Sequence, residues 1–502
     1  MPSIGVIGCG TVGATLVAAL AARAEEFTGP GELVLVDRPE GRWRGRAYQR
    51  DTEAVLANGP MFGMSLYLDD PEHGVRWAEA RGLAVHPDER GVHRFLSRPV
   101  YGDYLEDGVE EALDTLRAAG WRVRSVEERA TGVERDGDGV VIRHPGGSVR
   151  VDRAVLCVGG RADDDAYGLR GTPGYIDDPY PLRDALAEVP EDAEIAVIGS
   201  GMIATDVLMA LRAFGHQGRV TLASRSGLLP SVRRKAARVR PTVLTAERLA
   251  ELPKPLWLAD IAALAREEVE AAGGDFDAIA ADLLDPAPAE ERLRRQLDDS
   301  LSDDIGTQLL QRAVVDIGQD LWLALHDSDK EQVLRTLHSR LWSFASPIPR
   351  STAVKLVELC DEKRLRVRAG IETVERDGDG FLVRYEGCEN EGADRADLVV
   401  NAVTSVYRPE PPSAGGLLGL ARTSGILADH PHGGIRVDGE TGRALTASGQ
   451  ADDHLFVLGE LTRGAYYFVS AVASFTRRAD EIAASLAALP EPAVRDAALS
   501  TP

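Results

Sequence analysis

The first residues of this chain whose types and spacing could do chemistry form a glycine turn, Gly8-Cys9-Gly10-Thr11-Val12-Gly13. The turn follows the apolar run SIGVI and precedes a run typical of a helix. A first glycine permits a tight turn, a second lets the backbone approach a pyrophosphate, and a third lets helix and strand pack closely. The N–H groups at the start of the helix would bind phosphate. The pattern therefore predicts a dinucleotide site at Gly8, Gly10 and Gly13.

The next predicted strand, LVLVD, ends in Asp37. A carboxylate at this place can hold the hydroxyl pair of a ribose, and it would repel a 2′-phosphate. The first unit is therefore expected to prefer a dinucleotide without a 2′-phosphate.

A second copy of the turn lies at Gly199-Ser200-Gly201-Met202-Ile203-Ala204, again between an apolar run and a helical one. The strand that follows has no acid at its end but carries Ser224 and Arg225. Serine and arginine can bind a 2′-phosphate, so this unit is expected to prefer NADPH. From Arg225 to Arg240 the chain is basic and lacks acids, although its net charge is −23, and this local reversal suggests an anion site. For the arginines and lysine at 233–235, a solvated helix face is an equal alternative.

One heptapeptide, VERDGDG, occurs at Val133–Gly139 and again at Val374–Gly380. Each copy lies between two β-like runs, and this arrangement predicts a hairpin. A buried-looking strand follows each hairpin. Two nucleotide-binding units, each with its own β-excursion and return strand, explain the repeat. The acids are expected to form turns, because the further ligands of a calcium loop are missing.

The region from about Arg240 to Ser343 is rich in Ala, Leu, Glu and Arg with helical spacing, and its DPAPAEE segment is expected to interrupt the helices. We expect a helical insertion in which Trp257, Trp322 and Trp342 belong mainly to the core. The final run, AYYFVSAVASFTRRADEIAASLAAL, is predicted to be a helix.

The predicted fold class is α/β, with two Rossmann-like dinucleotide-binding domains of glutathione-reductase type and a helical insertion. The expected division is an FAD-binding domain at 1–185 and 405–502, an NADPH-binding domain at 186–240 and 344–404, and the insertion at 241–343.

Bulk composition excludes several classes of protein. The acidic balance argues against nucleic acid and anionic membranes as partners, because basic contacts to phosphate dominate such binding. No apolar run reaches the length of a membrane span. The four cysteines form no CxxC pair and the ten histidines have no metal-ligand spacing, so no metal is predicted. Few cysteines and no signal peptide favour the cytoplasm. A homo-oligomer is left open.

Several further motifs resemble those of flavoproteins with two dinucleotide-binding domains, such as the flavin-containing and N-hydroxylating monooxygenases. The resemblance extends over most of the chain, and the motifs that carry it are RGRAYQRDTEAVLANGPMFGMS, FLSRPVYGDYL, LCVGG, DDPYP, GSGMIA, SRSGLLP, IPR and LGELTRG. The chain departs from that group in the comparable stretch LRGTPGYIDDPYP, which lacks the histidine of the flavin-containing monooxygenase fingerprint.

The resemblance implies the cofactors FAD and NADPH and a set of contacts to each. FAD would contact Gly8, Gly10, Gly13, Asp37, Asn58, Ser65, Gly459 and Glu460, with Arg46, Tyr48 and Met64 as further candidates. NADPH would contact Gly199, Gly201, Ser224 and Arg225. Tyr466, Tyr467 and Phe468 would lie near the flavin. Arg350 and Arg463 are candidates for anchoring an anionic substrate or the nicotinamide amide, and structural salt bridges are the equal alternative.

The same resemblance implies an NADPH-dependent FAD monooxygenase. Its partners would be molecular oxygen and a small nucleophilic substrate, an amine or amino acid whose nitrogen is oxygenated. Such an enzyme needs little from titratable side chains, because the cofactor carries the chemistry. One alternative is an FAD-dependent NAD(P)H oxidoreductase that inserts no oxygen. The other is a nucleotide-sensing protein without turnover.

Overall fold

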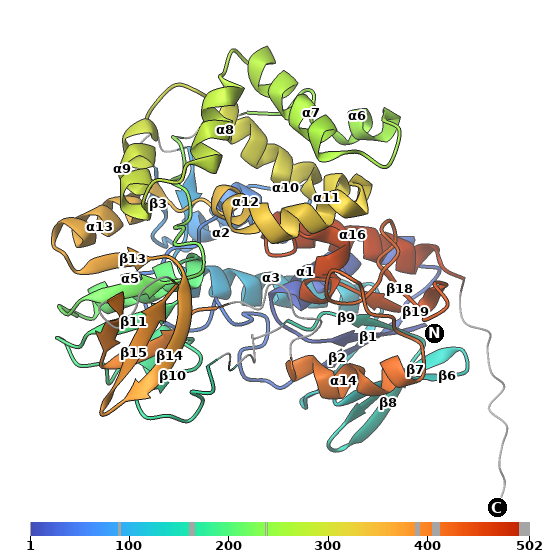
Figure 1. The fold of residues 1–502 in the computed structure, drawn as a ribbon. Coiled ribbons are helices and arrows are strands. Elements are labelled where there is room, and N and C mark those ends of the chain that lie inside the picture. The colour runs from blue at the N-terminus through green and yellow to red at the C-terminus, as the bar shows by residue number, and fades with distance from the viewer. Residues whose placement is uncertain are drawn as a thin grey trace, which may run out of the picture.

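A computed structural model describes residues 2–88, 92–159, 165, 167–235, 237, 239–386, 392–403 and 412–490. Its elements form two α/β units that lie side by side under a group of helices (Figure 1). The ends of both expected return segments, Gly160 and Thr404, lie outside the described residues, as does Cys388.

The first unit is built on a sheet with the strand order β18-β19-β9-β1-β2-β5. All its strand pairs are parallel except β18 with β19. The strands are β1 Ser3–Ile7, β2 Glu32–Val36, β5 Arg122–Val126, β9 Arg153–Leu156, β18 Arg443–Leu445 and β19 Ala451–Val457.

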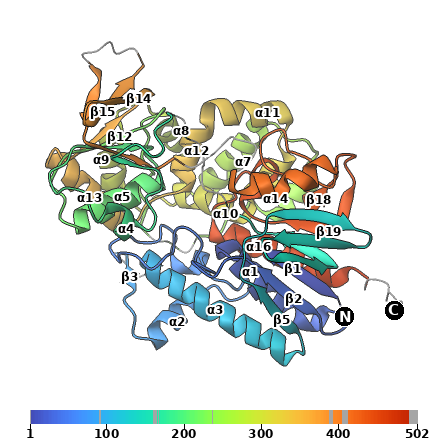
Figure 2. The same cartoon turned by 90° about the horizontal axis from the view of Figure 1, so that it is seen from below.

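Helices cover one face of this sheet and a small second sheet covers the other (Figure 2). The helices are α1 Thr11–Ala22, α3 Arg98–Ala118 and α16 Val472–Ala488. The opposite face carries β6 Gly132–Asp136, β7 Gly139–His144, β8 Gly147–Val151 and α14 Pro412–Thr423. Smaller elements of this unit are α2 His73–Ala80, β3 His86–Pro87 and β4 Arg94–Phe95.

The second unit repeats this plan. Its sheet has the order β10-β17-β11-β12-β13, and every pair is parallel. The strands are β10 Tyr175–Ile176, β11 Ile195–Ile198, β12 Val220–Ala223, β13 Leu365–Arg368 and β17 Leu398–Asn401. One face packs against α4 Leu182–Leu186, α5 Met202–Ala213 and α13 Arg350–Asp361. The other packs against β14 Ile371–Asp377, β15 Gly380–Tyr385 and β16 Asp394–Ala396.

The repeated heptapeptide forms equivalent hairpins in the two units, as the sequence predicts. Asp136 pairs with Gly139 across the first turn, and Asp377 pairs with Gly380 across the second. Gly137 and Gly378 have positive φ angles of 56° and 61°, which glycine adopts at little cost.

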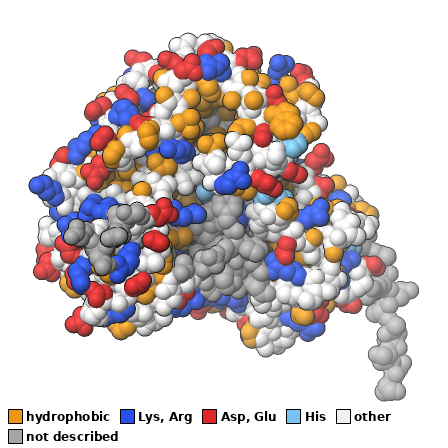
Figure 3. All heavy atoms as spheres, in the orientation of Figure 1, with side chains coloured by type: hydrophobic (Ala, Val, Ile, Leu, Met, Phe, Trp, Pro, Cys, Tyr) orange, Lys and Arg blue, Asp and Glu red, His pale blue; other side chains and the backbone are white. Residues whose placement is uncertain are grey.

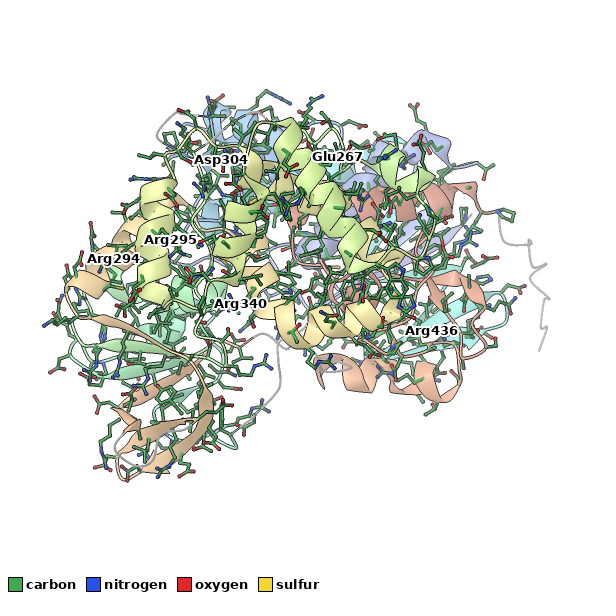
Figure 4. All side chains as sticks on the ribbon, turned by 45° about the horizontal axis from the view of Figure 1, so that its top comes forward. Glu267, Arg294, Arg295, Asp304, Arg340 and Arg436 are labelled. Carbon is green, nitrogen blue, oxygen red and sulfur yellow. The ribbon has the colours of Figure 1, made fainter. Side chains whose placement is uncertain are left out.

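The helical insertion contains α6 Ala246–Glu251, α7 Leu258–Ala271, α8 Phe276–Leu284, α9 Ala289–Asp299, α10 Gly306–Ala324, α11 Asp327–Gln332 and α12 His338–Ala345. Arg294 of α9 donates to Asp361 of α13 at 2.8 Å, and Arg340 of α12 donates to the carbonyls of Leu283 and Asp285 (Figure 4). The insertion is therefore joined to the second unit through α9.

Three local predictions need correction. The DPAPAEE segment interrupts the helices between α8 and α9 as predicted, but its last three residues already belong to α9, which begins at Ala289. The final helix begins at Val472, because Tyr467 has a φ of 58° that ends α15, Arg463–Tyr466. Trp257 is 50% exposed rather than in the core, and Figure 3 shows hydrophobic side chains exposed among charged ones over the insertion. Trp322 is buried, as expected.

Candidate functional site

The first glycine turn has the geometry that its spacing predicts. The N–H of Gly8 donates to the carbonyl of Val36 at 3.1 Å, and its φ is 95°. A β-carbon on Gly13 would lie 2.5 Å from the carbonyl oxygen of Gly8, so only glycine allows this approach of helix to turn. A β-carbon on Gly10, the N-cap of α1, would lie 3.3 Å from the α-carbon of Gly45.

The second turn is similar in its backbone. The N–H of Gly199 donates to the carbonyl of Ala223 at 2.7 Å, and its φ is 114°. Gly201 is the N-cap of α5, and a β-carbon there would meet nothing within 4 Å. Both turns therefore present the N–H groups of a helix start, which suit a phosphate.

The residues after the second strand of each unit also lie against their turns. Asp37 accepts a hydrogen bond from the backbone N–H of Cys9 at 2.8 Å. Ser224 shares a hydrogen bond of 2.8 Å with the hydroxyl of Ser200, the residue equivalent to Cys9. Arg225 is exposed, and its side chain has no recorded partner within the described part of the chain.

Both turns border one cavity of about 3210 Å³. Thirteen of the residues predicted from the sequence line it: Gly8, Gly10, Asp37, Arg46, Tyr48, Asn58, Met64, Gly199, Gly201, Ser224, Arg225, Glu460 and Arg463. A volume of this size exceeds that of an ordinary small-ligand pocket and leaves room for two dinucleotides and a further ligand.

Four of the predicted cofactor contacts and anchor residues do not line the cavity. Gly13 has the packing role already described. The hydroxyl of Ser65 donates to the carbonyl of Asp70 at 2.7 Å, within its own loop. Gly459 has a φ of 85° and lies against Val12, so it positions the turn before Glu460. Arg350 begins α13 and donates through Nε to Ser300 at 3.1 Å, away from the cavity.

The other anchor candidate, Arg463, is engaged by a neighbouring carboxylate. Its Nη2 lies 2.7 Å from Oε1 of Glu460. Burial raises the pKa of Glu460, and the guanidinium of Arg463 opposes that rise. This contact fits the salt-bridge alternative stated for Arg463.

Aromatic side chains from the insertion and from the turn before α16 form another wall of the cavity. Tyr467 stacks on Trp322 with ring centroids 4.4 Å apart, and both line the cavity with Trp342, Phe468 and His338. Nδ1 of His338 lies 2.9 Å from the hydroxyl of Tyr467. Burial lowers the pKa of His338 to about 4, so its imidazole is neutral at pH 7. Tyr467 and Phe468 therefore line the cavity, and their place beside a flavin stays a prediction.

Tyr466 differs from its two neighbours. Its hydroxyl donates to the carbonyl of Asp438 at 3.3 Å, and the guanidinium of Arg478 lies 4.3 Å from its ring centroid. The side chain therefore packs away from the cavity.

A buried ion pair that sequence reasoning missed joins the two units beside the cavity. Nη2 of Arg98 in α3 lies 2.8 Å from Oδ2 of Asp206 in α5, and the hydroxyl of Tyr180 donates to the same carboxylate. Nearby, Arg46 pairs with Asp178 at 2.8 Å. Motif reading gave no signal for Asp206, because its partner is more than a hundred residues away in the sequence.

Arg233, a member of the basic run named in the sequence analysis, also lines the cavity. Its Nη2 donates to the carbonyls of Asn58 at 2.9 Å and Pro347 at 3.3 Å. The basic run at 225–240 was a signal, but it could not identify which of its members reaches the cavity.

Two classes of feature are not found in the described residues. No group of His, Cys, Asp and Glu there could hold a metal ion. In the same residues, no helix combines the length and apolar character needed to cross a membrane.

Comparisons with known proteins agree with this architecture. Residues 5–161 match a protein-family model described as FAD-NAD(P)-binding. None of the curated proteins matches the sequence.

Solved structures resemble the chain over nearly its whole length. The reduced form of the ornithine hydroxylase from Pseudomonas aeruginosa is 15% identical, with a TM-score of 0.58, over 97% of this chain and 98% of that one. The Kutzneria sp. 744 ornithine N-hydroxylase is 14% identical, with a TM-score of 0.59, over 96% and 98%. The L-lysine 6-monooxygenase from Pseudomonas syringae is 16% identical, with a TM-score of 0.56, over 96% and 98%. The chain thus has the two-unit α/β fold of these hydroxylases, and its first unit matches the FAD-NAD(P)-binding family.

Proposed function

We propose that the protein is an NADPH-dependent FAD monooxygenase that oxygenates the nitrogen of a small amine or amino acid. The observation that carries this proposal is the convergence of two nucleotide-binding turns and an aromatic wall on one cavity. The similar solved structures are named as ornithine and lysine hydroxylases, and this supports nitrogen as the oxygenated atom.

FAD would occupy the first unit and NADPH the second. The first unit offers the start of α1 to a pyrophosphate and Asp37 to a ribose, whereas the second offers the start of α5, Ser224 and the exposed Arg225. We propose the same division of the chain as in the sequence analysis. FAD would bind to residues 1–185 and 405–502, NADPH would bind to residues 186–240 and 344–404, and residues 241–343 would form the insertion. Strand β10, which pairs into the second sheet, would then cross from the first segment.

When bound, the flavin would supply the transfer of electrons from NADPH to oxygen. Overall, an N–H group, oxygen, NADPH and a proton would give N–OH, water and NADP⁺. The chain itself would bind, orient and exclude water. Trp322, Trp342 and Tyr467 would shield the reacting end of the cavity from solvent, and the neutral His338 would fix the orientation of the Tyr467 hydroxyl.

The test uses FAD-loaded protein. Anaerobic NADPH should bleach the visible absorption of the flavin, and readmitted oxygen should restore it. With labelled oxygen and a panel of amines and amino acids, a hydroxylamine should form that carries one labelled atom for each NADPH consumed.

Two outcomes would overturn the proposal in different ways. NADPH consumption with quantitative peroxide and no oxygenated product across the panel would favour the oxidoreductase without oxygen insertion. No flavin reduction by NADPH would favour a nucleotide-sensing protein.

A further inference from the structure

The segment after β12 carries Arg233 to the junction of the two units and the insertion. Val232 forms a parallel bridge with Ile348, and the N–H of Arg233 donates to the carbonyl of Ile348 at 2.9 Å. Its guanidinium then reaches Asn58 of the first unit. The position of this guanidinium is therefore fixed by backbone from two separate parts of the chain.

The guanidinium of Arg233 contacts only neutral groups. Nη2 donates to two carbonyls, and Nε is buried with no hydrogen-bond partner. Within the described residues, no carboxylate lies within ion-pairing distance of it, and burial alone lowers its pKa to about 10. The group is thus still charged at pH 7.

Three other arginines that line the cavity are neutralised by acids. Arg46 pairs with Asp178, Arg98 with Asp206, and Arg463 with Glu460. Burying a charge without a counter-ion is costly, and proteins normally pair such groups. A half-buried arginine that lines a ligand-sized cavity and has no acid partner among the described residues is therefore suited to an anion supplied by the ligand.

Of two neighbouring groups, the indole of Trp342 favours the same kind of ligand, whereas the imidazole of His93 is neutral. Burial and the nearby Arg233 lower the pKa of His93 to about 4, so this imidazole adds no positive charge at pH 7. Trp342 also lines the cavity, and its Nε1 is buried without a partner. Because an indole N–H can only donate, the group that satisfies it must be an acceptor. The N–H of Ser231 donates to the carbonyl of Ser343 at 3.0 Å. The segment that carries Arg233 therefore lies beside the one that carries Trp342.

We propose that Arg233 is the specificity-determining residue that binds a carboxylate of the substrate, so that the enzyme acts on an amino acid rather than on a simple amine. The reaction named in this proposal rests on the proposed function, whereas the binding of the carboxylate by Arg233 does not. The free edge of one guanidinium matches the two oxygens of a carboxylate. The phosphates of the coenzymes have other donors at the starts of α1 and α5 and at Arg225.

The experiment measures binding by calorimetry with oxidised, FAD-loaded protein and without NADPH. The probes are the twenty common L-amino acids, benzoate and succinate, and each amino acid that binds is compared with the amine that lacks its carboxylate. We expect at least one carboxylate to bind and its amine to bind at least tenfold more weakly. Arg233→Met should weaken the binding of the carboxylate at least tenfold and leave the binding of the amine unchanged. Arg233→Lys should restore part of the lost affinity.

Arg212→Met is the matched control, because Arg212 belongs to the same unit but pairs with Glu358 outside the cavity. It should bind every probe as the wild type does. Circular dichroism and FAD content establish that each variant is folded.

Three results would overturn the proposal: no carboxylate binds, Arg233→Met binds the carboxylate as tightly as the wild type, or Arg233→Met raises the KM for NADPH tenfold in anaerobic flavin reduction. The last would assign Arg233 to a coenzyme phosphate. Because the binding assay involves no turnover, a protein that binds the carboxylate through Arg233 but forms no oxygenated product would refute the proposed function alone.

Discussion

Gly10 and Gly201 precede α1 and α5 with nearly the same backbone angles, φ −87° and ψ −159° against φ −88° and ψ −155°. Their surroundings differ. The loop after β2 lies over the first turn, where the N–H of Trp43 donates to the carbonyl of Cys9 and a β-carbon on Gly10 would meet Gly45. Gly201 is exposed, and a β-carbon there would meet open space.

This difference teaches how one motif can serve two kinds of ligand. A dinucleotide at the covered turn would be enclosed by protein and would leave slowly. One at the open turn could exchange with solvent. The comparison therefore predicts a retained FAD in the first unit and an exchanging NADPH in the second, and single substitutions at equivalent positions can test it.

The largest expected effect is the loss of FAD from Gly10→Val. A side chain there would occupy the place of the pyrophosphate and press on the backbone of Gly45. The FAD content, measured from the ratio of visible to ultraviolet absorption, should fall from about one FAD per chain to almost none.

Gly201→Val is the matched control for that experiment. It should fold normally and keep FAD, because a β-carbon there meets no protein atom within 4 Å, but it should weaken the binding of NADPH. A yellow, FAD-loaded Gly10→Val protein would contradict the assignment of FAD to the first unit.

The next effect concerns the third position of each turn, which is Gly13 in one unit and Ala204 in the other. A β-carbon at 13 would lie 2.5 Å from a backbone oxygen, whereas Ala204 is accommodated and fully buried. Gly13→Ala should therefore lower the free energy of unfolding by about 1–3 kcal/mol.

The reverse change, Ala204→Gly, should cost about 1 kcal/mol, because it removes a buried methyl group and frees the unfolded backbone. Urea denaturation of both FAD-loaded variants measures these changes. Equal stability of Gly13→Ala and wild type would show that the turn and helix can separate.

Much of this comparison could be predicted from the sequence, because it depends on local patterns. The glycine spacing, the strand before it and the helix after it are all contained within short segments such as 3–22 and 195–213. The hairpins follow from D-G-D-G between alternating runs for the same reason.

The remainder depends on contacts between distant segments. Arg233 and Arg350 both belong to basic or motif-bearing stretches, yet the bridge of Val232 to Ile348 brings the first to the cavity while the second faces Ser300. The break at Tyr467 likewise needs tertiary packing, because an apolar aromatic run alone indicates a continuous helix. Its stacking on Trp322 and hydrogen bond with His338 come from the insertion.

A smaller effect is expected at the coenzyme end of the second unit. Arg225 is exposed and follows Ser224, which stands where the first unit has Asp37. A guanidinium bound to a phosphate makes charge-assisted hydrogen bonds of about 1.5–3 kcal/mol each. Arg225→Ala should raise the KM for NADPH at least about tenfold, which corresponds to ~1.4 kcal/mol. The KM for NADH should change little, and FAD should stay bound.

Anaerobic flavin reduction with both coenzymes decides this prediction. Equal losses for NADPH and NADH would mean that Arg225 supports the fold or the shared pyrophosphate. A wild-type preference for NADH would overturn the choice of NADPH.

The smallest expected effect tests the link between each turn and the strand end behind it. In the first unit this link is the bond from the backbone of Cys9 to Asp37, so the thiol is not needed for it. In the second unit the hydroxyl of Ser200 bonds with Ser224 and donates to the carbonyl of Leu228 at 2.7 Å. Ser200→Cys, which gives the second unit the residue of the first, should therefore cost about 1 kcal/mol of unfolding free energy, the net value of a typical hydrogen bond. It should also raise the KM for NADPH by less than Arg225→Ala does, because it loosens Ser224 without removing a charge.

Urea denaturation and flavin reduction measure the two effects, and Cys9→Ala should leave the KM for NADPH unchanged. If Ser200→Cys altered neither stability nor the KM, the serine pair would have no part in holding the second turn, and the backbone bond from Gly199 to Ala223 would be sufficient.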